Sequence, residues 1–423
     1  MKSLRPTALK PRVPLPQAAA VLLGCFLMGG AVEHTSATDA PASRFELPAN
    51  AYRLSALAFS RDVQWLAAWR LPDQVELWDV GKGSRAAVWT EGPAGPWSSL
   101  PGGHRRPLAF LEDDKRILVA SATNVALHDV LSGKIEQALD DSGPDLGQIS
   151  ISPDGHRVVG VTAEGEFAFW SLPDGHRLTH LPTRRAPWER RGSPFNFNGM
   201  ALRRPPTSMS PETDWAFSPD GKAFAIGRVF AVDLWDSESG RWLSRYSGMD
   251  VPDFRIGAPT FGGGTRVAFL SPNHLAVVCG GAFAVLSVGT NLAALAVTNP
   301  ASPPKERLDI RALGVSTDGT RFAVAGMRMG SRPSFGDPGA GAVFDVPLHG
   351  EIQVWNAVPL RLLVTIKGTT EEKFGAVALD AAGKRVAAIT TGVRYTAHMN
   401  RSQQQAAERS PPGPYGVAAW DVP

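Results

Sequence analysis

Cysteine is nearly absent from this sequence. The 423 residues contain two cysteines, Cys25 within an apolar N-terminal run and Cys279 in the strand-forming segment LAVVCGG. One cysteine outside the N-terminal run cannot make an internal disulfide or a cysteine-based metal cluster. We therefore expect Cys279 to be a buried, inert thiol.

Long helical patterns are also missing, and tyrosine is scarce, with 4 residues. Glycine and proline are abundant, with 43 and 35 residues, and 43% of the chain is hydrophobic. Apolar residues do not recur with the 3.6-residue period of an amphipathic helix over any useful length. This composition predicts many short strands that are joined by turns and share a substantial core.

The short motifs that mark common active sites are missing as well. The sequence has no Gly-x-Ser-x-Gly elbow, phosphate-binding loop, His-Glu-x-x-His pair or calcium-loop spacing. Its 9 histidines do not cluster, and His176 and His180 flank a predicted strand, where a spacing of four gives no shared metal-binding face. We therefore assign no catalytic, cofactor-binding or metal-ligating residue, and we expect no cofactor.

Residues 1–37 have the pattern of a signal peptide. Four basic residues precede the apolar run Ala18–Val32: Lys2, Arg5, Lys10 and Arg12. The small residues Thr35-Ser36-Ala37 offer a cleavage site, and the run is shorter than the ~20 residues that cross a bilayer. We expect an exported chain, periplasmic or secreted, with residues 38–43 as a linker. The alternative is LLGC, Leu22–Cys25, which resembles the lipobox of bacterial lipoproteins and would give cleavage before Cys25 and lipidation there.

An excess of positive charge is missing from the rest of the chain. The formal net charge is +3, and residues 1–37 carry that +3 by themselves, so the remainder is formally neutral. A protein that neutralises many phosphates normally keeps a basic excess. The charge therefore disfavours nucleic-acid binding, and it leaves a lipid anchor as the one expected membrane contact.

What the sequence does have is a repeat. Each copy reads as strand a, a tight turn, strand b, strand c with an aromatic anchor, a second turn and strand d. The copies span Leu54–Trp89, Pro107–Leu139, Gly147–Leu181, Trp215–Leu243, Val267–Val297, Arg311–Gly368 and Gly375–Val422. The strand-c anchors are Trp78, His128, Trp170, Trp235, Leu286, Trp355 and Trp420. One such unit cannot bury both of its faces, so repeated four-stranded units predict a ring of blades.

The turns and anchors resemble the WD-repeat β-propeller family. SPDG occurs at Ser152–Gly155 and Ser218–Gly221, and WD occurs at Trp78-Asp79, Trp235-Asp236 and Trp420-Asp421. The resemblance implies an all-β, seven-bladed propeller over residues 44–423, with four-stranded antiparallel blades.

The chain departs from this family's pattern before strand a. The family's Gly-His pair is missing from most copies, with Gly103-His104 as the nearest match. We therefore expect the tryptophans to act as apolar wedges between blades.

Ring closure is predicted from the two ends of the repeat. The chain stops at Pro423, directly after strand c of the seventh copy, while Arg44-Phe45-Glu46-Leu47 precedes the first copy with no local partner. Pairing of residues 44–47 with the last blade would complete it and remove two open edges.

The long connections predict a recognition face. Alternating strands place the a–b and c–d turns on one face of the ring and the b–c and d–a connections on the other. Every long segment falls in the second set, as insertions at about 92–106, 184–213, 249–266, 298–309, 328–350 and 391–414. Long loops on a rigid scaffold commonly carry function. The alternative is that d–a loops are longer because they cross to the next blade.

The insertion Arg184–Thr213 contains the strongest candidate binding residues. Its arginines and aromatics are Arg184, Arg185, Trp188, Arg190, Arg191, Phe195, Phe197, Arg203 and Arg204. Guanidinium groups bind carboxylates or phosphates in a bidentate fork, and aromatic rings add stacking area. This chemistry suits an acidic peptide, a phosphorylated surface or an anionic glycan. The alternative is a solvated loop whose arginines pair with acids elsewhere.

Together these features indicate a non-catalytic platform of the cell envelope that binds a protein or peptide through the face with the long loops. One alternative is a propeller enzyme, a hydrolase or a quinone-type dehydrogenase, with a site at the axial channel on the same face. The segment WDSESGRW, Trp235–Trp242, resembles repeats of quinone-dependent dehydrogenase propellers. The other alternative is a structural or self-association role.

Overall fold

The computed structural model describes strands and turns over most of the repeat region. The described residues are 43–46, 54–70, 73–91, 108–111, 113–121, 124–140, 148–152, 154–161, 167–172, 174–178, 195–197, 200–202, 214–228, 231–247, 265–279, 282–289, 292–298, 306–333, 343–368, 372–392 and 415–423. The chain divides into two units, residues 1–35 and 36–423, and all described residues belong to the second. The predicted signal peptide, Cys25 and the linker at 38–42 lie outside them.

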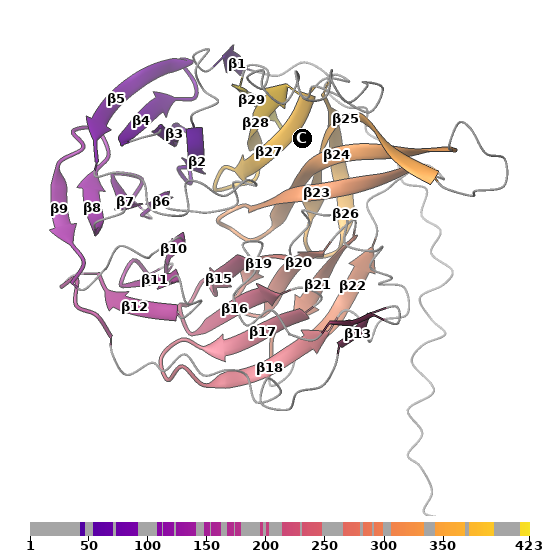
Figure 1. The fold of residues 1–423 in the computed structure, drawn as a ribbon, viewed down its shortest axis with the longest axis horizontal. Helices are drawn as coiled ribbons and strands as arrows, with labels where there is room; N and C mark the ends of the chain where they lie inside the picture. The colour runs from indigo at the N-terminus through magenta and orange to yellow at the C-terminus, as the bar shows by residue number, and fades with distance from the viewer. Residues whose placement is uncertain are drawn as a thin grey trace, which may run out of the picture. The chain divides into compact units, whose positions relative to one another are not determined.

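The second unit is a seven-bladed propeller of four-stranded antiparallel blades (Figure 1). Blades 1 and 2 are formed by β2 (Leu54–Phe59), β3 (Trp65–Arg70), β4 (Gln74–Asp79) and β5 (Ser84–Thr90), and by β6 (Leu108–Phe110), β7 (Arg116–Ala120), β8 (Val125–Asp129) and β9 (Ile135–Ala138). Blade 3 has β10 (Gln148–Ile151), β11 (Arg157–Val161) and β12 (Phe167–Ser171). Blade 4 has β15 (Asp214–Phe217), β16 (Ala223–Arg228), β17 (Ala231–Asp236) and β18 (Trp242–Ser247).

The remaining blades follow the same order along the chain. Blade 5 has β19 (Arg266–Ser271), β20 (His274–Cys279), β21 (Ala282–Ser287) and β22 (Ala293–Thr298). Blade 6 has β23 (Glu306–Val315), β24 (Arg321–Pro333), β25 (Val343–Asn356) and β26 (Arg361–Lys367). Blade 7 has β27 (Glu372–Leu379), β28 (Arg385–Gly392), β29 (Tyr415–Asp421) and, from the N-terminal side, β1 (Ser43–Glu46). A separate hairpin joins β13 (Phe195–Phe197) to β14 (Met200–Leu202).

One detail refines the predicted blades. In blade 3, the predicted fourth strand His176–Leu181 is marked among the described residues by one isolated bridge, Trp170 with Arg177. No helix occurs in the described part of the chain, and hence none there that is long and apolar enough to cross a membrane.

The N-terminal strand closes the ring. β1 pairs antiparallel with β29, from Ser43 opposite Ala419 to Glu46 opposite Gly416. The predicted closure is confirmed, one residue earlier than the expected 44–47. The outer edge of β29 is therefore paired, as are the c strands of blades 1, 2, 4, 5 and 6, whereas β12 of blade 3 has only the isolated bridge.

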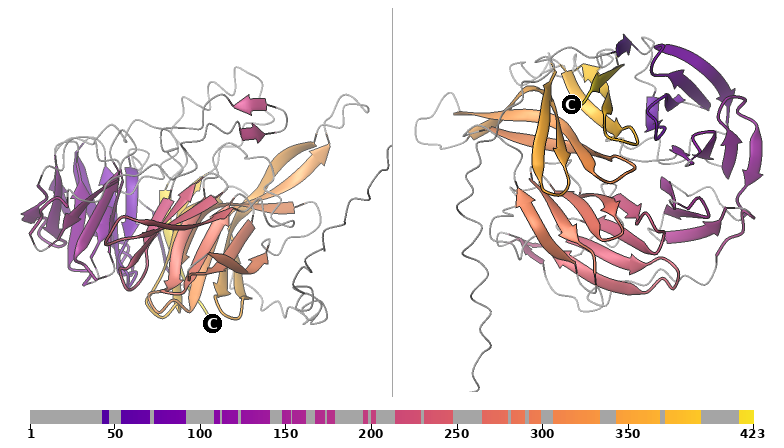
Figure 2. Two further views of the ribbon diagram at one scale, coloured as in Figure 1. Left: turned by 90° about the horizontal axis from the view of Figure 1, so that it is seen from below. Right: turned by 180° about the vertical axis from the view of Figure 1, so that it is seen from behind.

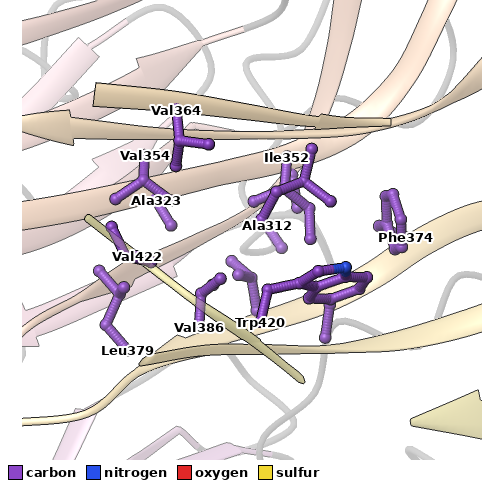
Figure 3. Close-up of a cluster of buried hydrophobic side chains, with 14 of the residues drawn as sticks. Ala312, Ala323, Ile352, Val354, Val364, Phe374, Leu379, Val386, Trp420 and Val422 are labelled. Carbon is purple, nitrogen blue, oxygen red and sulfur yellow. The ribbon is translucent and has the colours of Figure 1, made fainter. Parts of the chain in front are cut away.

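The core consists of seven hydrophobic clusters, each shared by two neighbouring blades. Figure 3 shows the cluster between blades 6 and 7, where Ile352 and Val354 lie opposite Val386 and Trp420. Another cluster joins blade 7 to blade 1 and so completes the circle. Middle strands such as β3 and β4 are buried on both faces because a blade lies on each side, which explains their runs of Leu, Ala and Val.

The strand-c anchors pack against the preceding blade, as predicted for wedges. Trp235, Trp355 and Trp420 are buried in clusters that they share with that blade. Their indole N–H groups meet no hydrogen-bond acceptor among the described residues. Trp170 differs, because its Nε1 donates to the Asp140 carbonyl at 2.7 Å. These anchors therefore stabilise the ring mainly by apolar burial.

The a–b turns are tied by a serine and an aspartate two residues apart. Ser152 Oγ donates to Asp154 Oδ1 at 2.5 Å, and Asp154 Oδ1 also accepts from the His156 backbone N–H at 3.0 Å. The same serine-to-aspartate bond recurs at Ser218–Asp220 and at the corresponding turns of blades 1 and 6. The aspartates of the two SPDG turns therefore serve the turn itself, as aspartates at such positions commonly do.

Aspartates that directly follow the strand-c anchors likewise hydrogen-bond within the c–d turns. Asp129 Oδ1 accepts from the Ser132 backbone N–H at 2.8 Å and from its hydroxyl at 2.6 Å. These hydrogen bonds lower the pKa of Asp129. In the WD dipeptide of blade 4, Asp236 Oδ1 likewise accepts from the Ser239 backbone N–H and hydroxyl, both at 2.7 Å, so this aspartate also closes its turn.

The ring has two different faces. We call the side with the a–b and c–d turns the turn face, represented by Ser152–His156 and Asp236–Arg241. We call the side with the b–c and d–a connections the insertion face, represented by the adjoining ends of β24 and β25. Strands such as β3 and β4 have six residues and end at the surface of the ring. In contrast, β24 and β25 have 13 and 14 residues and project beyond the other blades (Figure 2).

Candidate functional site

Blade 6 carries an extension on the insertion face. β24 and β25 stay paired from Arg321 opposite Asn356 out to Pro333 opposite Val343. β23 joins the extension, with Glu306 opposite Gly330. The sequence predicted a loop insertion at about 328–350, but strands occupy much of it. The reason is that hydrogen bonding between the strands continues through a bulge next to Arg328, where the pairing shifts by one residue.

A buried ion pair lies at the base of this extension. Arg328 and Glu351 are 3% and 1% exposed. Arg328 Nε donates to Glu351 Oε2 at 2.9 Å, and Arg328 Nη2 donates to Glu351 Oε1. The fork arrangement uses both oxygens of the carboxylate, which is the strongest geometry for an arginine–carboxylate pair.

Two further side chains complete the pair. Gln353 Nε2 donates to Glu351 Oε1 at 2.7 Å, and His349 Nε2 lies 3.3 Å from Glu351 Oε2. Burial by itself would raise the pKa of Glu351, but the bonds from His349, Arg328 and Gln353 and the charge of Arg328 outweigh it and lower the pKa. The carboxylate is therefore ionised and fixed at neutral pH, which stiffens the point where the extension leaves the blade.

Blade 1 holds a second buried carboxylate toward its b–c end. Glu76, 1% exposed, accepts from Arg70 Nη2 at 2.9 Å and from Arg85 Nη1 at 3.0 Å. Trp78 Nε1 also donates to it, at 3.2 Å. In this blade the indole N–H of the anchor tryptophan therefore has a hydrogen-bond acceptor, and that acceptor is a glutamate of the same strand.

Blades 1 and 2 are joined by a buried histidine–glutamate contact. His128 Nε2 lies 3.1 Å from Glu91 Oε1, and His128 Nδ1 lies 3.0 Å from the Gly133 carbonyl, to which it donates. The ring of His128 stacks on Trp89 with centroids 6.2 Å apart. Burial raises the pKa of Glu91, although the charge of His128 and a bond from Trp89 oppose it. A histidine at this anchor position therefore contacts the preceding blade through one polar contact, with Glu91, as well as by packing on Trp89.

The structure places few of the predicted binding residues. Phe195 and Phe197 belong to β13, in the hairpin with β14. The others lie outside the described residues: Arg184, Arg185, Trp188, Arg190, Arg191, Arg203 and Arg204. Within the described part of the chain, no group of three or more His, Cys, Asp and Glu side chains is placed to hold a metal ion.

A pocket that the sequence did not indicate opens on the turn face. It has a volume of about 310 Å³ and lies between blades 2 and 3. Leu111, Leu127 and Leu172 form its apolar part, and Asp113, Arg116 and the Asp154 turn form its polar part. The sequence signal is the leucine at 111, where blades 1, 3, 4 and 6 have a serine.

Comparison with known proteins addresses the fold. No protein-family model matches the chain, and no curated protein matches it significantly. Among solved structures, the chain is similar to the β-propeller domain of Myceliophteria thermophila Cps50 (Swd1), with 13% identity, a TM-score of 0.55, and coverage of 90% of this chain and 100% of that one. It is also similar to a chain of the mitotic checkpoint complex, with 15% identity, a TM-score of 0.54 and coverage of 99% of both chains. At these identities the likeness concerns the fold alone, which is a β-propeller.

Proposed function

We propose that this chain is a non-catalytic platform of the cell envelope that binds a protein or peptide through its insertion face. The observation that carries the proposal is the strand extension of blade 6, in which β23 pairs with β24 as far as Gly330 and β24 pairs with β25 out to Pro333. It is a paired sheet with a buried ion pair at its base, so its outer end is held in a fixed direction. Binding elements on a rigid scaffold lose little conformational entropy when a partner docks.

The contrast between the two faces supports the proposal. On the turn face, the connections are short and their polar groups bond to each other, as in Ser152–Asp154 and Asp129–Ser132. On the insertion face, blade 6 extends well past the ring. The arginine-rich segment 184–213 is a d–a connection in the sequence, and strand order predicts it on the same face. Export of the chain, proposed from residues 1–37, would place this face in the envelope or outside it.

Affinity capture from an envelope extract tests the proposal with two variants. In the first, an Asn-Gly turn replaces Ser331–Asp345, so that Gly330 and Val346 remain paired and the Arg328–Glu351 contact is kept. In the second, serine replaces all six arginines of the 184–204 segment. The matched control replaces six exposed basic residues of the turn face with serine: Lys82, Arg177, Lys222, Arg241, Arg361 and Lys384.

The expected result is a partner retained by the unchanged chain and by the control but lost from at least one insertion-face variant. Capture that is equal for all chains would overturn the proposal. Size-exclusion chromatography of the same set separates a platform from a self-association role, because only the latter predicts a change in the protein's own oligomeric state.

A further inference from the structure

The pocket between blades 2 and 3 has the features of a built site. Leu111, Leu127 and Leu172 are each at most 5% exposed, so the apolar part belongs to the core between the blades. The volume of about 310 Å³ is within the range of small-molecule sites, about 300–1,000 Å³. The repeat itself explains why this space is open.

The first residue of strand b bridges two blades elsewhere in the ring. In blade 3, Arg157 Nη1 donates to the Ser237 carbonyl of blade 4 at 3.2 Å. In blade 6, Arg321 Nη1 donates to the carbonyls of Gly383 and Pro423 of blade 7, at 3.1 and 2.9 Å. At both interfaces an arginine side chain covers the neighbouring turns.

Blade 2 has an arginine at the same position, Arg116, but it folds back onto its own turn. Arg116 Nε donates to Asp113 Oδ2 at 2.8 Å. Asp113 corresponds to Asp154 of blade 3, which accepts the hydroxyl of Ser152. Leu111 stands where that serine would be, so Asp113 has no hydroxyl partner in its turn and takes the guanidinium instead.

The residues of blade 3 that correspond to the acceptors of a bridging arginine line the pocket. Leu172 corresponds to Ser237, Gly155 corresponds to Gly383, and both Leu172 and Gly155 line the pocket. A Cβ placed on Gly383 would lie 2.6 Å from Arg321 Cδ, because the arginine stem passes over that glycine. A Cβ placed on Gly155 would meet nothing within 4 Å in the described part of the chain.

We propose that this pocket binds the arginine side chain of a partner protein, in the place that a bridging arginine fills at other blade interfaces. The aliphatic stem would lie on the three leucines, and the guanidinium would donate to the Gly155 carbonyl beside the Asp154 carboxylate. The charge of Asp113 is already compensated by Arg116. The carboxylate of Asp154 borders Gly221 of blade 4 and lies near Arg157, and it adds a second negative charge to the lining of the pocket.

The ionisation of Asp154 agrees with this assignment. Burial by itself would raise the pKa of Asp154, but hydrogen bonds from Ser152 and from the His156 backbone outweigh it and lower the pKa. The carboxylate is therefore charged at neutral pH and attracts a cation. A guanidinium suits the site better than an ammonium because its fork can reach a carbonyl and a carboxylate together.

A ligand-observed NMR titration of the full chain tests the proposal. The probe is N-acetyl-arginine methylamide, and its uncharged isostere N-acetyl-citrulline methylamide is the control. We expect the arginine probe to bind at least tenfold more tightly than the citrulline probe. Free arginine, which has charged α-amino and α-carboxyl groups, distinguishes an arginine residue of a protein from a free amino acid as the ligand. If the ligand is an arginine residue, free arginine should bind no better than the blocked form.

Two variants test the mechanism that opens the pocket. Asp113→Ala releases Arg116 to bridge to blade 3, so binding of the arginine probe should fall at least tenfold. Arg116→Ala breaks the same ion pair but leaves the pocket open and removes a like charge, so binding should be kept or become several-fold tighter. Asp220→Ala is the matched control, because it removes the equivalent turn aspartate of blade 4 without touching the pocket.

Any of three results would overturn the proposal. They are equal binding of both probes, tighter binding of free arginine than of the blocked form, and similar losses of probe affinity in Asp113→Ala and Arg116→Ala. The pocket is on the turn face, so its failure is separate from a failure of the insertion-face proposal.

Discussion

The buried pair at the base of the blade 6 extension allows a double-mutant cycle with a large expected coupling. The cycle uses Arg328→Met, Glu351→Leu and the double variant, which replace the ions by apolar side chains of similar size. Removing one partner of a buried pair leaves the other charge without its counter-ion, which costs about 3–5 kcal/mol, whereas replacing both is commonly close to neutral. We expect each single variant to lower the free energy of unfolding by about 3–5 kcal/mol. The double variant should lose clearly less than the sum of the two single losses, and less than the larger of them.

The structure also predicts which single variant is worse. Glu351→Leu removes the acceptor of Gln353 and His349 as well as the counter-ion of Arg328, so it should be more destabilising than Arg328→Met. The assay is urea denaturation followed by tryptophan fluorescence, with the free energy of unfolding compared at one pH. Losses that add within about 0.5 kcal/mol would refute the coupling on which the stiff extension depends.

The pH dependence of stability should have opposite directions in the unchanged chain and in Arg328→Met. In the unchanged chain the pKa of Glu351 is below its ordinary 4.5, so its stabilising contribution is present above pH 4.5 and is lost as the pH falls through the folded value. In Arg328→Met, burial is no longer opposed by the guanidinium, and we expect the pKa to rise above 4.5. The contribution of Glu351 then reverses, so that stability falls as the pH rises through that region.

Three further predictions concern the ring itself, each checked by urea denaturation. Gly155→Ala should cost about 1–2 kcal/mol, from its positive φ alone, whereas Gly319→Ala should cost clearly more because its Cβ would fall 1.5 Å from a carbonyl oxygen of blade 5; equal losses would contradict the close approach. Trp170→Phe should cost about 1 kcal/mol more than Trp420→Phe, since only the former loses a hydrogen bond seen in the structure; the reverse order would count against the wedge role of the anchors. Deleting residues 43–46 should lower stability and promote association through the exposed edge of blade 7; unchanged stability and a monomeric product would contradict ring closure by β1.

The features that could be predicted from the sequence are the ones that recur locally. The tight turns, the strand-c anchors and the count of blades follow from short-range patterns, because each copy repeats the same turn and the same alternation. Ring closure was predictable because residues 44–47 and the last copy each lacked a partner. The anchors were also predictable as wedges, since the family's Gly-His pair is missing.

The features that could not be predicted depend on contacts between distant residues. Arg328 looks like a loop residue in a segment rich in glycine and proline, and its burial requires the pairing with Glu351, 23 residues away. The pocket depends on a single exchange of serine for leucine at 111, whose effect on Arg116 is visible only beside the bridging arginines of blades 3 and 6. The hydrophobic periodicity of the sequence does not indicate which partner a single side chain contacts.

Site-specific photo-crosslinking tests directly whether the insertion face is the recognition surface. A photoreactive residue replaces Ser331, at the outer end of β24, in one chain and Ser239, in a c–d turn of the turn face, in another. After incubation with envelope extract, we predict that a discrete partner becomes crosslinked to the chain labelled at 331 and not to the chain labelled at 239. A partner crosslinked from 239 but not from 331 would contradict the account.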